Sequence, residues 1–212
     1  MLELGFKTLV AYLLGSVIGS LLLGRLRGVD IRTQGSGNAG GTNALRTQGW
    51  VFALGVIVVD VGKALVAVGW LPGASLPGIG IDAHVDRDWL LVACATAVVL
   101  GHVYPVWHEF RGGKGAATLV GAAAVLAPAA LLPVAGVWLL TLVLTGYVGL
   151  GTMLATATLP LYFAFAEPDR PALVVYGLLM AVFIVYTHRS NLQRMRAGNE
   201  NRARRLWLLR PR

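Results

Sequence analysis

The sequence is poor in charged residues and in cysteine. Charged side chains make up 13% of the 212 residues, about half the share of a typical soluble domain, whereas hydrophobic side chains make up 56%. The single cysteine, Cys94, cannot form an intrachain disulfide and cannot by itself build a zinc or an iron–sulfur site. These shortages exclude an ordinary soluble domain and a disulfide-stabilised one, and they leave helix packing as the expected role of Cys94.

Long apolar runs recur along the chain, and each is near the length that crosses ~30 Å of hydrocarbon. We count seven, at about residues 4–24, 50–70, 89–107, 115–130, 131–147, 152–166 and 171–187. The first has no basic region before it and no small-residue cleavage site after it, which indicates a retained helix and not a removable signal peptide. The sequence therefore predicts an all-α integral membrane protein, a seven-transmembrane-helix bundle forming a single polytopic domain over residues 1–212.

The basic residues are unevenly distributed among the predicted loops. With the N-terminus outside, 14 of the 18 Lys and Arg residues face the cytoplasm, and only Arg87 and Arg170 lie in outer loops. This positive-inside pattern predicts an external N-terminus and a cytoplasmic C-terminus. A net charge of +8 could suit nucleic acid, but setting the topology or contacting anionic lipid accounts for most of these arginines.

A glycine-rich polar stretch, residues 35–43, follows the first apolar segment. Glycines adopt positive φ and let backbone N–H groups converge on an anion. Polar side chains accompany them, with a guanidinium suited to phosphate at the end: Ser36, Asn38, Thr42, Asn43 and Arg46. The stretch predicts a phosphate-binding loop at a membrane surface, and the alternative is a flexible glycine-rich linker.

A second polar cluster ends in Gly-Gly-Lys-Gly at residues 112–115, just before an apolar segment. Glycines at a helix start offer free N–H groups to an anion, and Lys114 adds a mobile charge. The pattern is not a Walker A loop, because the first glycine and the Lys-Ser/Thr pair are missing. A lysine that only sets topology is the alternative. His102 and His108 lie six residues apart and place no third ligand on one helical face, so no metal site is predicted.

The third cluster begins at His188. If the last apolar helix continues for one turn, His188 and Asn191 share a face at i, i+3. Histidine titrates near neutrality, which leaves both an acid–base role and a hydrogen-bonded structural role open. Glu200 is the only acid in a strongly basic tail, and we expect it to pair with an arginine more readily than to act as a base.

Two ionisable residues interrupt the second apolar segment. Asp60 and Lys63 stand at i, i+3, and charges in a membrane span are costly unless they face the bundle interior. A mutually neutralising structural pair is the favoured interpretation, and the alternative is that Lys63 reaches a cytoplasmic site.

Together the three clusters resemble the motifs of the acyl-phosphate:glycerol-3-phosphate acyltransferase family (PlsY) of bacterial integral membrane enzymes. The resemblance covers almost the whole chain and rests on residues 36–43 with Arg46, on Gly101, His102, Pro105, Phe110 and residues 112–115, and on His188, Arg189, Asn191, Arg194, Gly198, Glu200 and Arg202. There are two departures. Gly41 stands where the family usually has alanine, and residues 147–152 replace Tyr-x-Ser-Leu-Ala-Ser with Tyr-Val-Gly-Leu-Gly-Thr, so that a serine role cannot be carried to Gly149.

The resemblance implies transfer of a fatty acyl group from acyl phosphate to the sn-1 hydroxyl of glycerol 3-phosphate, giving lysophosphatidic acid and phosphate. It implies a multi-pass protein of the bacterial inner membrane with a cytoplasmic site, no cofactor, no metal, no nucleic acid and no obligate protein partner. The implied catalytic residues are Ser36, Lys114, His188 and Asn191. The implied substrate-binding residues are Gly37, Asn38, Gly40, Thr42, Asn43, Arg46, Gly113, Lys114, Thr152 and Glu200.

The chemistry is consistent with these residue types. Acyl phosphate is already activated, so its leaving phosphate needs fixed hydrogen-bond donors more than a protein nucleophile. The sequence also lacks the His-x4-Asp pattern of acyltransferases that use acyl-CoA. Either the donor phosphate or His188 takes the hydroxyl proton. A transporter would carry more ionisable residues at mid-membrane, and a CDP-alcohol transferase would need clustered aspartates, whereas the predicted cytoplasmic loops contain only Asp30.

Overall fold

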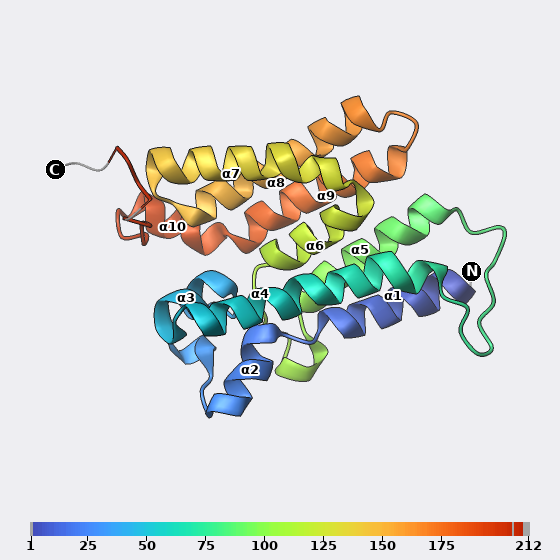
Figure 1. Cartoon of the computed structure of the whole chain (residues 1–212), viewed down its shortest axis with the longest axis horizontal. Coiled ribbons are helices and arrows are strands. Elements are labelled where there is room, and N and C mark those ends of the chain that lie inside the picture. The colour runs from blue at the N-terminus through green and yellow to red at the C-terminus, as the bar shows by residue number, and fades with distance from the viewer. Residues whose placement is uncertain (1, 205, 210–212) are drawn as a thin grey trace. The chain divides into compact units, whose positions relative to one another are not determined.

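The computed structural model describes residues 2–204 and 206–209, and the chain divides into two compact units, Met1–Leu126 and Ala127–Arg212. Within the described residues every regular element is a helix, as Figure 1 shows. The prediction of an all-α protein is therefore confirmed, whereas the assignment of residues 1–212 to a single domain stays a prediction.

The first unit contains six α-helices with shorter helical turns among its described residues. They are α1 (Leu2–Gly15), α2 (Gly19–Arg27), η1 (Ile31–Thr33), α3 (Gly41–Gln48), α4 (Trp50–Ala64) with its continuation η2 (Leu65–Trp70) and η3 (Leu71–Gly73), α5 (Arg87–Val103), η4 (Val106–His108) and α6 (Ala116–Leu126). Helix α1 packs along α5, and α4 packs against α2, α3 and α6. A Cβ at Gly15 would collide with the Val98 carbonyl, and one at Gly101 with the Tyr12 carbonyl. Glycine at both crossing points therefore lets α1 and α5 approach closely.

The first predicted span is broken. In place of one helix over residues 4–24, α1 and α2 meet at a bend of 40°. Ile18 has extended backbone angles (φ −94°, ψ 116°), and the Ser16 hydroxyl donates to the Tyr12 carbonyl at 3.0 Å. Kinks of this kind occur at Gly/Ser pairs, and Gly15-Ser16 is such a pair.

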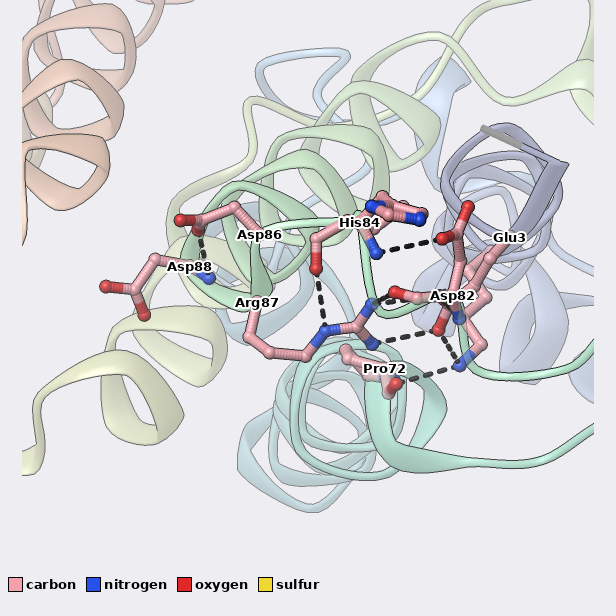
Figure 2. A network of polar contacts seen from close by, with 9 residues as sticks. Glu3, Pro72, Asp82, His84, Asp86, Arg87 and Asp88 are labelled. Carbon is pink, nitrogen blue, oxygen red and sulfur yellow. Dashed lines mark hydrogen bonds and ion pairs between the residues drawn. The ribbon is translucent and has the colours of Figure 1, made fainter.

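The buried carboxylate of Glu3, near the N-terminus, links the start of α1 to the loop before α5 and to the start of α5. Glu3 is 2% exposed and accepts hydrogen bonds from Lys7 Nζ at 2.8 Å, from both Nη atoms of Arg87 at 2.9 Å and from the Asp82 backbone at 2.7 Å (Figure 2). Lys7 Nζ also donates to the Pro72 carbonyl at 2.8 Å. The network fixes the loop before α5 to the starts of α1 and α5.

The second unit contains η5 (Pro128–Ala130), α7 (Leu131–Thr145), α8 (Val148–Ala166), α9 (Pro171–Thr187) and α10 (Arg189–Arg196). Helix α8 packs against both α7 and α9. A Cβ at Gly177 would lie 2.7 Å from the Pro160 nitrogen, so glycine allows α9 to approach the proline turn of α8. Phe163 and Tyr176 are fully buried in this unit.

The number of membrane spans is only partly established. Four helices among the described residues are long and apolar enough to cross a bilayer, and counting the bent pairs α1–α2 and α9–α10 as single spans gives six. Helix α6 has 11 residues, or about 16 Å of rise, which is too short for ~30 Å of hydrocarbon. It ends early because Ala127 precedes Pro128, and the residue before a proline is disfavoured in helical conformation. The fourth predicted segment, 115–130, is therefore shorter than expected, and the count of seven spans and the orientation of the termini stay predictions.

Candidate active site

The glycine-rich loop is folded around the side chain of Asn43, in the first turn of α3. Asn43 is 1% exposed, and its Nδ2 donates to the carbonyls of Ile31 at 3.2 Å and Gln34 at 3.0 Å. Its Oδ1 accepts from the Ser36 backbone N–H at 3.0 Å. Because these three bonds fix the loop, a flexible linker does not describe it. They also use the Asn43 amide inside the protein, so Asn43 shapes the loop.

The loop presents its remaining predicted residues at the surface. Ser36, Gly37, Thr42 and Arg46 are exposed, and Asn38 and Gly40 are half-buried. The rear of the loop is anchored, because the fully buried Ala39 accepts a hydrogen bond through its carbonyl from the Ser20 hydroxyl at 2.9 Å. The N-terminal N–H groups of α3 follow directly after Gly40, where no side chain caps them. Hydroxyl and backbone donors therefore occur together, as a phosphate site requires.

The turn that carries Lys114 is anchored to the end of α5. The N–H of Gly112 donates to the Val103 carbonyl, and the N–H of Gly113 donates to the His102 carbonyl, both at 3.1 Å. A Cβ at Gly113 would collide with the His102 imidazole. Lys114 is half-buried just before α6 begins. The glycines are thus needed for close packing against His102, and the turn is not a loose tether for a topological lysine.

Arg32 links the connection between α2 and α3 to the connection between α5 and α6. Its guanidinium pairs with the Asp30 carboxylate, with Nη2 and Oδ2 2.7 Å apart, and its Nη1 donates to the carbonyls of His108 and Arg111 at 3.4 Å. The hydrogen bonds from Arg32 hold the pKa of Asp30 below its usual range. The connection containing the glycine-rich loop and the one containing Lys114 therefore lie together, at the end of this unit away from the N-terminus (Figure 1).

His188 lies where α9 gives way to α10, at a bend of 50°. The straight continuation of the last apolar helix is therefore wrong, although Asn191 stays one turn away, with its N–H donating to the His188 carbonyl at 2.8 Å. His188 is 5% exposed, and its Nδ1 lies 2.8 Å from the Ile184 carbonyl. Because a carbonyl can only accept, Nδ1 carries the hydrogen of the neutral ring and Nε2 is the basic nitrogen.

Glu200 pairs with an arginine, as the sequence predicts. Arg194 Nε donates to Glu200 Oε2 at 2.6 Å, and Asn191 Nδ2 donates to Oε1 at 2.7 Å. Both oxygens of this buried carboxylate are thus engaged. The arrangement suits a residue that orients Asn191 and does not suit a general base.

The tail of the second unit docks on the turn between α7 and α8. The N–H of Ala203 donates to the Gly146 carbonyl at 2.8 Å, and Arg202 Nη2 donates to the Tyr147 hydroxyl at 2.7 Å. The guanidinium of Arg202 also lies over the rings of Tyr147 and Trp207, 4.4 and 4.1 Å from their centroids. Two segments that the sequence places on the cytoplasmic side therefore contact each other within this unit.

The gap that the sequence leaves between its fifth and sixth apolar segments, residues 148–151, is helical, because α8 already begins at Val148. Thr152 is helical, and its hydroxyl donates to the Val148 carbonyl at 2.9 Å. Its assignment as a substrate ligand stays a prediction, as do those of the other site residues. Among the described residues, no group of three His, Cys, Asp or Glu side chains is placed to hold a metal ion.

The family model described as glycerol-3-phosphate acyltransferase matches residues 6–198. The chain belongs to this acyltransferase family. It is 35% identical to the glycerol-3-phosphate acyltransferase of Chlorobium luteolum, with 91% of this chain and 93% of that protein covered. It is 36% identical to the enzyme of Chlorobium chlorochromatii, with 95% and 97% covered.

The acyltransferase family also includes solved structures. The chain matches a crystal structure of PlsY (YgiH), an integral membrane glycerol 3-phosphate acyltransferase, in its glycerol 3-phosphate form, with a TM-score of 0.80, 33% identity and 94% of each chain covered. The lysophosphatidic acid form gives a TM-score of 0.77 at 32% identity, again with 94% of each chain covered. This chain is therefore an acyltransferase and an integral membrane protein, and the resemblance read from its motifs is confirmed.

Within this acyltransferase, the structure shows what occupies the space at Gly149. A Cβ added there would lie 2.9 Å from Asn191 Nδ2 and 3.0 Å from its Cγ. The amide of Asn191 therefore packs directly on the backbone of α8 where the family tends to have a serine. In this chain the polar group at that place comes from α10.

Proposed function

We propose that the chain transfers a fatty acyl group from acyl phosphate to the sn-1 hydroxyl of glycerol 3-phosphate, releasing lysophosphatidic acid and phosphate. The main support is the loop fixed by Asn43, which presents backbone and hydroxyl donors at the same end of the first unit as the turn of Lys114. Such a group of donors and cations suits phosphate-bearing reactants.

The donor phosphate is assigned to the glycine-rich loop. The groups that hold it come from Ser36, Gly37, Asn38, Gly40 and Thr42, with Asn43 keeping the loop in shape. The glycerol hydroxyl oxygen attacks the acyl carbon, the bond from that carbon to the phosphate oxygen breaks, and inorganic phosphate leaves. Fixed N–H and O–H donors stabilise the charge that develops on the oxyanion and on the leaving phosphate, which is the main catalytic requirement of an activated donor.

The acceptor phosphate is assigned to two cations, and the resemblance of the motifs assigns the orientation of the acceptor to His188 and Asn191. Arg46 and Lys114 hold the phosphate of glycerol 3-phosphate, with Gly113 giving the turn its close packing. His188 and Asn191 orient the acceptor, and Glu200 holds the Asn191 amide through its 2.7 Å hydrogen bond. Positioning two reactants in this way lowers the entropic part of the barrier.

The hydroxyl proton goes to the phosphate of the donor. Glu200 is already engaged by Asn191 and Arg194 and is not a surplus base. The rival base is His188, whose Nε2 is the basic nitrogen of its neutral ring. If His188→Gln keeps near-normal turnover, the histidine is excluded as base.

We further propose that the chain lies in the bacterial inner membrane with seven spans, its N-terminus outside and its site on the cytoplasmic side, and that it needs no cofactor, metal or protein partner. Support comes from the arginine distribution and from the grouping of the polar connections at one end within each unit. Membrane lipid accommodates the acyl chain.

The deciding experiment incubates the purified protein with palmitoyl phosphate and labelled glycerol 3-phosphate. We expect labelled lysophosphatidate, which should persist in the presence of a chelator, and no product from palmitoyl-CoA. Product from palmitoyl-CoA alone would refute the proposed donor. Glycerol 3-phosphate flux into liposomes without product would indicate a transporter.

A further inference from the structure

Three buried polar side chains fill the break between α1 and α2, and the proposed chemistry uses none of them. They are Asp60 and Lys63 of α4, which are 1% and 8% exposed, and His102 of α5, which is 2% exposed. The sequence predicts the Asp60–Lys63 pair, and the structure confirms it with Nζ and Oδ1 3.1 Å apart. His102 joins the pair from another helix, which spacing along one helix does not reveal.

The pair compensates the two helix ends that the break creates. Lys63 Nζ donates to the carbonyls of Gly15 at 2.9 Å and Val17 at 2.8 Å, at the carbonyl end of α1. Asp60 Oδ1 accepts from the N–H of Gly19 at 3.1 Å, at the amide end of α2. Helix ends carry unsatisfied groups and partial charges, negative at carbonyls and positive at amides. Each member of the pair therefore lies at the end that attracts its charge.

His102 connects this pair to the turn of Lys114. Lys63 Nζ lies 2.9 Å from His102 Nδ1. The same Nδ1 lies 3.4 Å from Asp60 Oδ1, so the imidazole contacts both members of the pair. The Nε2 edge packs against Gly113, since a Cβ there would collide with it. The imidazole of His102 therefore contacts two groups. On one side it contacts Lys63, which bonds the α1–α2 break, and on the other it contacts Gly113, the neighbour of Lys114.

We propose that Lys63, Asp60 and His102 are positioning residues for Lys114, and that they set the affinity for the phosphate of the acceptor substrate, glycerol 3-phosphate. The inference rests on the proposed role of Lys114 in holding that phosphate. None of the three residues is assigned a contact with a reactant. Their effect passes through the packing of His102 on Gly113.

The first test compares two buried lysines of the same unit. Lys63→Met removes the ammonium of this network. Lys7→Met removes the fully buried ammonium that bonds Glu3 and the Pro72 carbonyl, away from the α1–α2 break. We expect both variants to lower the thermal stability of the purified protein. Only Lys63→Met should weaken glycerol 3-phosphate binding by about tenfold or more, measured by titration calorimetry without an acyl donor, because small displacements of a positioned group are costly.

Equal glycerol 3-phosphate affinity in Lys63→Met and the wild type would show that the network is only structural and would overturn the proposal. The calorimetric readout needs no donor, so it is independent of whether acyl phosphate is used. If palmitoyl phosphate yields no product while Lys63→Met loses binding, the proposed donor fails and the positioning role stands. In kinetic assays we expect the KM for glycerol 3-phosphate to rise by a similar factor, with kcat changed much less.

A second test does not depend on folding of the Lys63 variant. Gly113→Ala leaves the three residues intact but forces the turn away from the imidazole, and we expect it to weaken glycerol 3-phosphate binding by about tenfold. Adding His102→Asn keeps an acceptor near Lys63 and removes the Nε2 edge, which makes room for the new Cβ. The double variant should therefore bind more tightly than Gly113→Ala alone. A double variant that binds no better would contradict the proposal.

Discussion

The Asn191 amide lies directly against the backbone of Gly149, where a Cβ would stand 2.9 Å from its nitrogen. A side chain at position 149 must therefore displace an amide that is held by Glu200 at 2.7 Å. We expect Gly149→Ser and Gly149→Ala to lower turnover by about tenfold or more, because both add the Cβ that displaces Asn191.

Gly136→Ala is the matched control for this prediction, since Gly136 is also helical, in α7 of the same unit, and a Cβ there meets no atom within 4 Å. Steady-state rates with palmitoyl phosphate check the expectation. If Gly149→Ser is as active as the wild type, the Asn191 amide can move without cost and its packing on α8 does not matter for the reaction.

The side chain of Asn43 should be irreplaceable even by its closest analogue. Asn43→Asp keeps an acceptor for the Ser36 N–H but loses both donors to the carbonyls of Ile31 and Gln34. Unsatisfied buried groups cost about 1–3 kcal/mol each, so we expect lower thermal stability together with turnover reduced by about tenfold or more. Gln48→Ala, which removes only a half-buried bond to the Gln34 side chain, should have a small effect on both measurements.

Glu3 is expected to matter for stability and not for chemistry. Glu3→Gln leaves the fully buried Lys7 ammonium without a charged partner and weakens the two bonds from Arg87. Breaking a buried ion pair costs about 3–5 kcal/mol, so the unfolding temperature in detergent should fall by about 5 °C or more. The KM values of the folded fraction should stay at the wild-type level. A wild-type unfolding temperature would mean that solvent or detergent replaces the missing charge.

The Asp30–Arg32 pair makes a pH-dependent contribution. Hydrogen bonds from Arg32 lower the pKa of Asp30, so the folded state favours the carboxylate. The stabilisation is then present above the pKa of the unfolded chain, about 3.9, and is lost as pH falls through the lower folded value. Asp30→Asn should be slightly less stable than the wild type at pH 7, and the difference should shrink as the pH falls below about 4. Thermal unfolding of both proteins across that range checks this expectation. A difference that is unchanged at low pH would contradict it.

Several helix limits were predictable because local chemistry sets them. The last apolar segment, 171–187, coincides with α9 because Pro171 is suited to a first helical turn and the apolar run ends at Thr187. The fourth segment was too long because the effect of Ala127-Pro128 outweighs the apolar run. The break in the first segment was missed, since its completion depends on Asp60 and Lys63 from another helix.

In the candidate site, too, features set by the local sequence could be predicted, and features set by contacts between elements could not. The glycine-rich loop, Lys114 and the tail were identified as candidates from residue types and motifs, and their roles stay predictions. Sequence reasoning did not predict three features, because each depends on tertiary contacts. These are the inward use of the Asn43 amide, the bend at His188 and the packing of His102 on Gly113. Helical spacing relates only residues on one element, and it therefore assigned no role to His102.

The charges at the α1–α2 break also constrain how the chain is inserted into the membrane. Asp60 and Lys63 both belong to α4, and their partners lie on the helix pair made before it and on the helix made after it. A nascent chain that ends soon after α4 has no imidazole beside its ammonium. Ionisable groups in hydrocarbon are costly until they find partners. Asp60 and Lys63 therefore reach all of these partners only once residues 15–102 have been made and inserted, whereas the carbonyls and the amide of the α1–α2 break are already available when α4 follows.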